Sequence, residues 1–116
     1  MRDGDPEAAF DLAKRTLKEH PADVSLLRAM GTAAWECGDA RAAAGAFDQV
    51  LQRVPQDVEV RLWASVVARV SGDLSGARAH ARAALEADAA SSRGWLEMGR
   101  ISREERDAAE IGRAHV

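Results

Sequence analysis

Apolar and polar residues alternate along this chain with the spacing of amphipathic helices. In the segment after residue 38, Ala43, Phe47, Val50 and Leu51 fall mainly three or four residues apart, so they share one face of a helix. An aspartate begins five of these segments, where its oxygen can accept hydrogen bonds from the free amides of a first helical turn, and the last segment begins at Ser92. The pattern predicts helices over about 5–20, 23–38, 39–55, 57–72, 73–87 and 92–103.

These helical segments repeat at an interval of 34 residues. A Gly-Asp pair separates two helices each time, and small, apolar and proline positions keep the same step. The registered sets are Gly4-Asp5, Gly38-Asp39 and Gly72-Asp73; Ala9, Ala43 and Ala77; Leu17, Leu51 and Leu85; and Pro21 and Pro55. A fixed interval of this size indicates a stack of helix-turn-helix units, each too small to bury its apolar face without neighbours.

At these positions the chain resembles the tetratricopeptide repeat family, whose unit has a large residue and Leu-Gly in its first helix and Ala, an aromatic residue and Pro in its second. The residues that carry the resemblance are Leu27, Met30, Gly31, Ala34, Ala43, Phe47 and Pro55, then Trp95, Met98, Gly99 and Ser102. The middle unit departs from the pattern, with Arg61 in place of a large apolar residue and alanines such as Ala77 in its second helix.

The resemblance implies an all-α fold, a right-handed α-solenoid of antiparallel helix pairs with about six helices. Residues 1–109 would form the array. It would consist of the second helix of a partial repeat (1–23), two full repeats (24–57 and 58–91) and the first helix of a truncated repeat (92–109).

The family's packing implies structural roles for several small and aromatic residues. Gly31 is expected to lie against Ala43, so that two antiparallel helices touch closely. Trp95 occupies the structural aromatic position and is expected in the core, although without a partner helix Trp95 and Met98 would be poorly covered. In the middle unit, the displacement of apolar residues from Arg61 to Leu62 predicts a rotated helix or an exposed apolar surface.

The two ends of the chain are interpreted separately. Residues 110–116 (Glu-Ile-Gly-Arg-Ala-His-Val) resemble the in-frame translation of a sequencing adapter and break the repeat at Ile111, so they are interpreted as a non-native tail. The chain also opens on the second helix of a unit. Both features predict a piece of a longer reading frame.

The family's functional surface is a concave groove lined by the first helix of each unit. Carried over by register, its residues are Ser25, Arg28, Thr32, Trp35 and Glu36, then Glu59, Leu62, Val66, Arg69 and Val70, then Arg93, Leu96, Arg100 and Arg103. An apolar middle with five arginines against two glutamates predicts a peptide or protein partner that is acidic and apolar.

Each groove residue also has a structural interpretation. The arginines could be solvated helix faces, and Trp35 could be either a binding anchor or a residue packed against the neighbouring helix. On the binding hypothesis, Trp35→Ala or Arg69→Glu should weaken the partner's binding without unfolding the array.

Composition excludes several function classes. The formal net charge of −3 argues against nucleic-acid binding, and no apolar run is long enough for a membrane span. His20, His80 and Cys37 match no metal-ligand spacing, and no phosphate loop or nucleophile motif occurs. We therefore expect no cofactor, no metal and no catalysis within these residues, and a cytoplasmic location is favoured because the single cysteine cannot form an internal disulfide.

The sequence thus predicts a protein-interaction scaffold that presents its groove rigidly. Two alternatives remain open. The array could recruit substrates for a larger, truncated enzyme such as a transferase, or it could self-associate through the uncovered ends of the stack.

Overall fold

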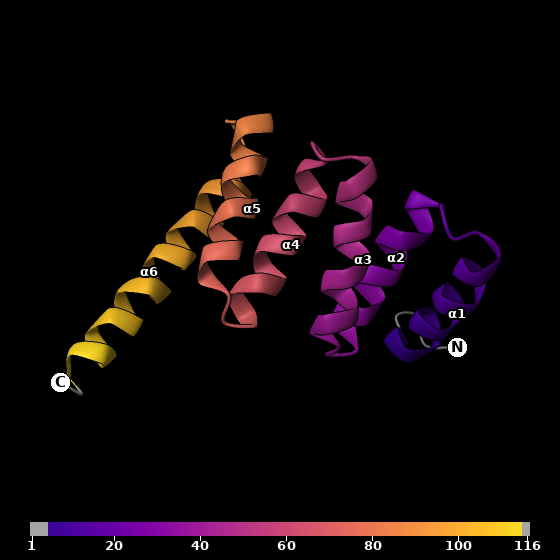
Figure 1. The fold of residues 1–116 in the computed structure, drawn as a ribbon, viewed down its shortest axis with the longest axis horizontal. Helices are drawn as coiled ribbons and strands as arrows, with labels where there is room; N and C mark the ends of the chain where they lie inside the picture. Colours follow the sequence, from indigo (N-terminus) through magenta and orange to yellow (C-terminus); the bar gives the residue numbers. More distant parts are fainter. Residues whose placement is uncertain (1–4, 115–116) are drawn as a thin grey trace. The chain divides into compact units, whose positions relative to one another are not determined.

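The computed structural model describes residues 5–114, which form α-helices joined by short turns with no strand in that range. The helices are α1 (Pro6–Glu19), α2 (Val24–Glu36), α3 (Ala40–Arg53), α4 (Val58–Val70), α5 (Leu74–Ala87) and α6 (Ser92–Ala114). They divide between two compact units, α1 to α3 in residues 1–55 and α4 to α6 in residues 56–116 (Figure 1). The predicted all-α helical-repeat fold is confirmed, and the handedness of the stack stays a prediction.

The predicted aspartates begin five of the helices. The side chains of Asp5, Asp23, Asp39, Asp57 and Asp73 each accept hydrogen bonds from first-turn backbone amides. Such a cap stabilises a helix by about 1 kcal/mol. The glycine of the repeated Gly-Asp pair ends the preceding helix, because Gly38 and Gly72 have φ of +81° and +91°, in the left-handed region that favours glycine.

In unit 1, α2 packs between α1 and α3. Leu27, Ala43 and Phe47 are fully buried there. A methyl group added at Gly31 would lie 2.5 Å from Cε1 of Phe47, so the glycine makes room for the aromatic ring. The sequence predicted Ala43 as the neighbour of Gly31, whereas the nearest atoms belong to Phe47.

In unit 2, a serine replaces the helix glycine in the 34-residue register. The hydroxyl of Ser65 donates a hydrogen bond of 2.8 Å to the carbonyl oxygen of Ala77, and both residues are fully buried. The small side chains of Ala77 and Ala81 let α6 approach closely enough for Ile101 to join them in one core cluster. The positions equivalent to Gly31 and Ala43 are therefore in direct contact in unit 2.

The Arg61 substitution does not expose apolar surface at the next position. Leu62 is only 4% exposed, and Val60 and Val67 are buried with it. Arg61 instead places Nη1 3.1 Å from Nδ1 of His80 on α5. The α4 helix therefore keeps its apolar side inward while a polar contact joins it to α5.

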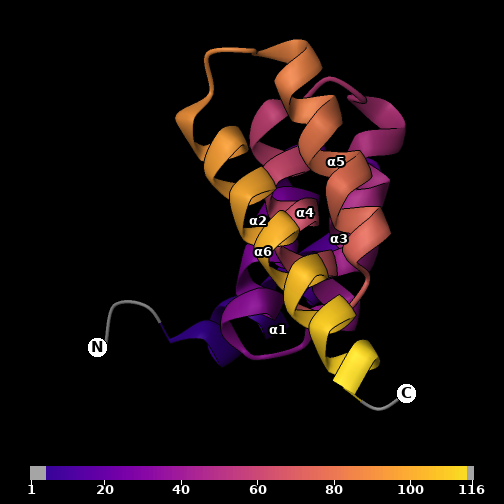
Figure 2. The ribbon, with the colours of Figure 1, turned by 90° about the vertical axis from the view of Figure 1, so that its left-hand side faces the viewer.

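Helix α6 is longer than predicted. It continues past Arg103 to Ala114 and so passes through most of the segment interpreted as a non-native tail, while residues 115–116 lie outside the described part. The stretch after Arg103 is rich in Glu, Arg and Ala, which favour helix, and contains no glycine before Gly112. Residues 106–112 are exposed, and this last part of α6 extends past α5 in both ribbon views (Figures 1 and 2).

The prediction that Trp95 lies in the core is wrong. Its side chain is 59% exposed, and its indole Nε1 donates a hydrogen bond of 2.9 Å to the carbonyl oxygen of Ala89. Gly99 is also exposed, with no atom near the place of a side chain, so it does not have the structural packing role assigned to it. The reason is that no described helix covers this face of α6 as α3 covers α2. The expected poor cover applies to Trp95 but not to Met98, which is partly buried against the core cluster of Ala77, Ala81 and Ile101.

Candidate partner-binding surface

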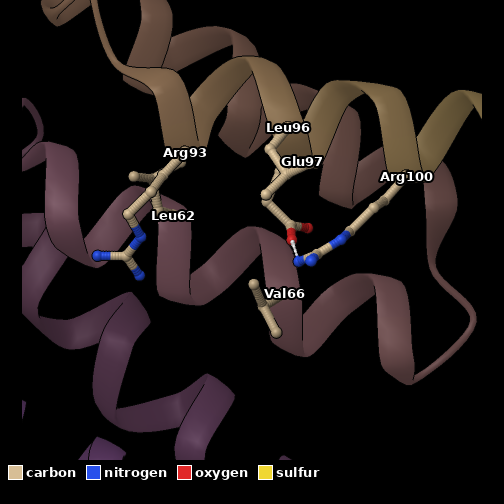
Figure 3. A pocket seen from close by; sticks show the side chains of 6 residues that line it. All are labelled: Leu62, Val66, Arg93, Leu96, Glu97 and Arg100. Carbon is tan, nitrogen blue, oxygen red and sulfur yellow. Dashed lines mark hydrogen bonds and ion pairs between the residues drawn. The ribbon is translucent and has the colours of Figure 1, made fainter.

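A hollow of about 90 Å³ lies between α4 and α6 in unit 2 (Figure 3). Its lining residues are Leu62, Val66, Arg93, Leu96, Glu97 and Arg100. All except Glu97 belong to the groove set that the 34-residue register predicts. The structure thus brings five predicted residues from two helices together around one surface depression.

Helical spacing explains why these side chains meet. Leu62 and Val66 are one turn apart on α4, and Arg93, Leu96 and Arg100 follow one face of α6. Leu62 is buried and forms the apolar floor of the hollow, whereas the side chain of Leu96 is 54% exposed. The hollow therefore offers apolar contact both at its bottom and along its rim.

Glu97 is the member of the hollow that sequence reasoning missed. It is 4% exposed, and its two carboxylate oxygens accept hydrogen bonds of 2.9 Å from Nη1 of Arg100 and 3.0 Å from Nε of Arg69. A buried carboxylate needs such partners, because an isolated buried charge is costly. One feature of the sequence could have predicted this burial. Glu97 stands between the large apolar residues Trp95, Leu96 and Met98, so a buried segment there would also bury the carboxylate of Glu97.

Arg69 has a structural role that the sequence did not reveal. Besides Glu97, it binds Oε1 of Glu104 at 2.9 Å through Nη1, and its side chain is only 15% exposed. Burial lowers the pKa of Arg69, but the hydrogen bonds to Glu104 and Glu97 outweigh burial and raise it overall. Arg69 thus joins α4 to α6, so its charge reversal would change the fold of unit 2 as well as any binding.

Arg93 is the arginine of the hollow that has no ion-pair partner in the described part of the chain. It is exposed and makes no hydrogen bond or ion pair with any residue the structure describes. Figure 3 shows Arg93 and Arg100 at opposite ends of the hollow, with Leu96 and Glu97 between them. Glu97 already binds Arg100. The guanidinium that can still bind a carboxylate of a partner is therefore that of Arg93, at the opposite end of the hollow.

The remaining predicted groove residues lie elsewhere in their units. In unit 1, Arg28, Thr32 and Trp35 are half-buried on α2, while Ser25 and Glu36 are exposed. The Thr32 hydroxyl donates to the carbonyl oxygen of Ala29 at 3.1 Å within its own helix. In unit 2, Glu59, Val70 and Arg103 are exposed and do not line the hollow.

A separate ion pair joins α5 to α6. Arg78 binds the carboxylate of Glu105 and also donates a hydrogen bond of 3.0 Å to the hydroxyl of Ser102. The hydrogen bond from Arg78 lowers the pKa of the Glu105 carboxyl, with burial acting in the opposite direction, and the same bond raises the pKa of Arg78. Arg78 and Glu105 therefore stabilise the charged forms of each other.

This pair predicts a pH-dependent contribution to stability. Because the pKa of Glu105 is lower in the folded chain than in the unfolded one, the stabilisation is complete above about pH 4.3, the unfolded value, and disappears as the pH falls through the folded pKa. We expect Arg78→Met to lower the free energy of unfolding more at pH 7 than at the acid end, where only the hydrogen bond to Ser102 remains to be lost. Urea titrations from pH 7 to pH 3 measure the difference, with Arg106→Met as the control. An equal effect of Arg78→Met at both pH values would contradict the assignment.

Candidate reactive groups give little support for chemistry. Burial, followed by the carboxylates of Glu7 and Asp11, raises the pKa of the Cys37 thiol, so it stays protonated near neutral pH. Within residues 5–114 no three His, Cys, Asp or Glu side chains gather as a metal site would require. None of the described helices has the length and apolarity needed to cross a bilayer.

The caps, the 34-residue register and the helix pairs define a helical-repeat protein. A family model, Tetratricopeptide repeat, matches residues 28–92, more than half of the chain, and the chain belongs to that family. Repeats of this family generally mediate protein–protein interaction and are typically non-catalytic scaffolds. No curated protein matches the chain.

Proposed function

We propose that this chain binds a protein partner through the hollow between α4 and α6, and that the bound segment carries a carboxylate next to an apolar side chain. The observation that supports this most is Arg93, an exposed guanidinium beside apolar side chains that makes no hydrogen bond or ion pair among residues 5–114. A guanidinium binds a carboxylate through two parallel hydrogen bonds, which fixes direction as well as charge.

The apolar part of the partner would contact Leu62, Val66 and Leu96. Its carboxylate would lie toward Arg93, because Glu97 stands nearer the Arg100 end and would repel a second anion there. The buried Glu97 therefore determines the direction in which a segment would bind. A segment with the acidic group at the wrong end would lose the contact to Arg93 and meet Glu97 instead.

A displayed library of random 12-residue peptides, selected on the 116-residue chain, tests the proposal. We expect enrichment of sequences with Asp or Glu a few residues from Leu, Ile or Phe. For enriched peptides, Arg93→Glu should weaken binding by at least about tenfold, equivalent to about 1.4 kcal/mol. Fluorescence anisotropy with labelled peptides measures the dissociation constants.

Arg106→Glu is the matched control, since Arg106 is another exposed arginine of α6 that does not line the hollow. Leu96→Ser should weaken the same peptides through the apolar contact. Peptides without acidic enrichment, or equal losses in Arg93→Glu and Arg106→Glu, would overturn the proposal. The participation of Trp35 and the role of the array as a recruiting arm of a larger enzyme stay predictions.

A further inference from the structure

A cluster of positive charge lies on one exposed face of α1 in unit 1. The side chains of Lys14, Arg15 and Lys18 are exposed, and these residues stand within about one helical turn of each other. Together with Asp11 they line one surface depression. The chain as a whole has a formal net charge of −3, so this face has the opposite sign from the whole chain.

The contacts within α1 leave two of these three cations available. Nζ of Lys14 lies 3.5 Å from Oδ1 of Asp11 and 4.3 Å from the centroid of the Phe10 ring. The side chains of Arg15 and Lys18 make no hydrogen bond or ion pair with any residue between 5 and 114. The helix dipole favours a cation in the last turn, which accounts for Lys18 alone.

The same face stays open in the other second helices of the repeats. The residues equivalent to the three cations are Asp48, Gln49 and Gln52 on α3, and Arg82, Ala83 and Glu86 on α5. All of these are exposed except Ala83, which is half-buried, although α2 packs against α3 and α4 packs against α5. The pairing of a second helix with its first helix therefore leaves this face open, and among these three helices only α1 concentrates cations on it.

We propose that this basic face of Lys14, Arg15 and Lys18 binds an acidic, extended segment of a protein partner, at a site separate from the hollow of unit 2. The Cβ atoms of Arg15 and Lys18 are about 5–6 Å apart, because residues three apart are neighbours on a helix surface. In an extended segment, side chains two residues apart point to the same side at a spacing of about 7 Å. Two glutamates in the pattern Glu-x-Glu therefore match the two cations, with Arg15 donating two parallel hydrogen bonds and Lys18 acting as a point charge. Glu7 and Asp11 stand nearer the start of α1 and repel an anion there, so the acidic residues of the segment lie over the second half of the helix.

Membrane and nucleic-acid binding fit this face less well. A helix that lies on a bilayer inserts several large apolar side chains beside its cations, whereas on α1 only Leu12 combines a large apolar side chain with an exposure of 59%. A nucleic acid is repelled by the negative net charge of the chain. A short acidic segment needs only a few matched carboxylates, which the basic face supplies with partners.

Fluorescence anisotropy with a labelled peptide of alternating glutamate and serine tests the basic face on the whole 116-residue chain. We expect binding at low salt that the double variant Arg15→Glu/Lys18→Glu weakens by at least about tenfold. Arg41→Glu/Arg53→Glu is the matched control, because it reverses two exposed arginines of α3 and changes the net charge equally. Circular dichroism should show both variants folded, since all the substituted side chains are exposed.

A neutral variant separates the loss of attraction from the repulsion that a new carboxylate adds. Arg15→Gln/Lys18→Gln should also weaken the peptide, by a smaller factor than the reversal. Absence of binding at low salt, or equal losses in the α1 and α3 variants, would overturn the proposal. Preferential binding of vesicles that contain phosphatidylserine, or of single-stranded DNA, would overturn the assignment to a protein segment. Arg93→Glu should leave the affinity for this peptide unchanged, which separates the result from the test of the hollow.

Discussion

Replacing Gly31 with leucine is expected to lower the free energy of unfolding of unit 1 by about 1–3 kcal/mol. The physical reason is steric. Even a methyl group at this position would lie 2.5 Å from the Phe47 ring, and Phe47 is fully buried, as are Leu27 and Val50 of the same unit. The ring cannot move aside without opening the core, so α2 and α3 must separate. Urea denaturation followed by circular dichroism measures the loss.

Gly45→Leu is the control for this result. Gly45 lies within α3 of the same unit, is exposed, and has open space where a side chain would stand. Leucine favours helix over glycine by somewhat less than about 1 kcal/mol, so this variant should be slightly more stable than the parent. Opposite signs for the two substitutions are the expected outcome. A stable Gly31→Leu variant would contradict the role of Gly31 as the space for Phe47.

The sequence predicted the helices well where local chemistry determines them. Each Gly-Asp pair contains both a residue that tolerates positive φ and a residue that caps the next helix, so boundaries such as Gly38-Asp39 and Gly72-Asp73 could be located in advance. The repeat register then indicated which faces are buried. These features depend on neighbours within a few residues, which is why a single sequence is sufficient to find them.

Predictions failed where the outcome depends on a distant element. The pattern predicted a last helix ending near Arg103, but α6 continues to Ala114, because the following residues favour helix locally. Trp95 was assigned to the core from its position in the repeat, yet burial requires a covering helix and none of the described helices provides one. A repeat position therefore predicts a face of a helix, whereas exposure depends on what lies opposite.

In the candidate site, too, the residues that share a helix face could be predicted from the sequence, whereas the ion pairs between helices could not. The family resemblance, carried over by the 34-residue register, put Leu62, Val66 and Leu96 in one groove set, and these three side chains line one hollow. That this set binds a partner stays a prediction. The pairing of charges could not be predicted in this way. Whether Arg69 lies in solvent or contacts Glu97 depends on the approach of α6 to α4, which involves residues 28 positions apart.

Arg69→Glu is expected to destabilise unit 2 by about 3–5 kcal/mol, the usual loss when one partner of a buried ion pair is removed. The substitution would remove the donors to Glu97 and Glu104 and place a third carboxylate beside them. Glu97 is nearly inaccessible to water, so it cannot recover the lost hydrogen bond from solvent. Denaturant titration of the variant at neutral pH measures this effect.

The double variant Arg69→Met/Glu97→Leu distinguishes a lost ion pair from a general intolerance of change. It removes both charges and keeps most of the apolar volume, so it should be much closer to the parent in stability than Arg69→Glu. If Arg69→Glu were as stable as the parent, the ion pairs would contribute little to the contact between α4 and α6. Arg69 would then be available to a partner, and its reversal would become a valid test of binding at the hollow alongside Arg93→Glu.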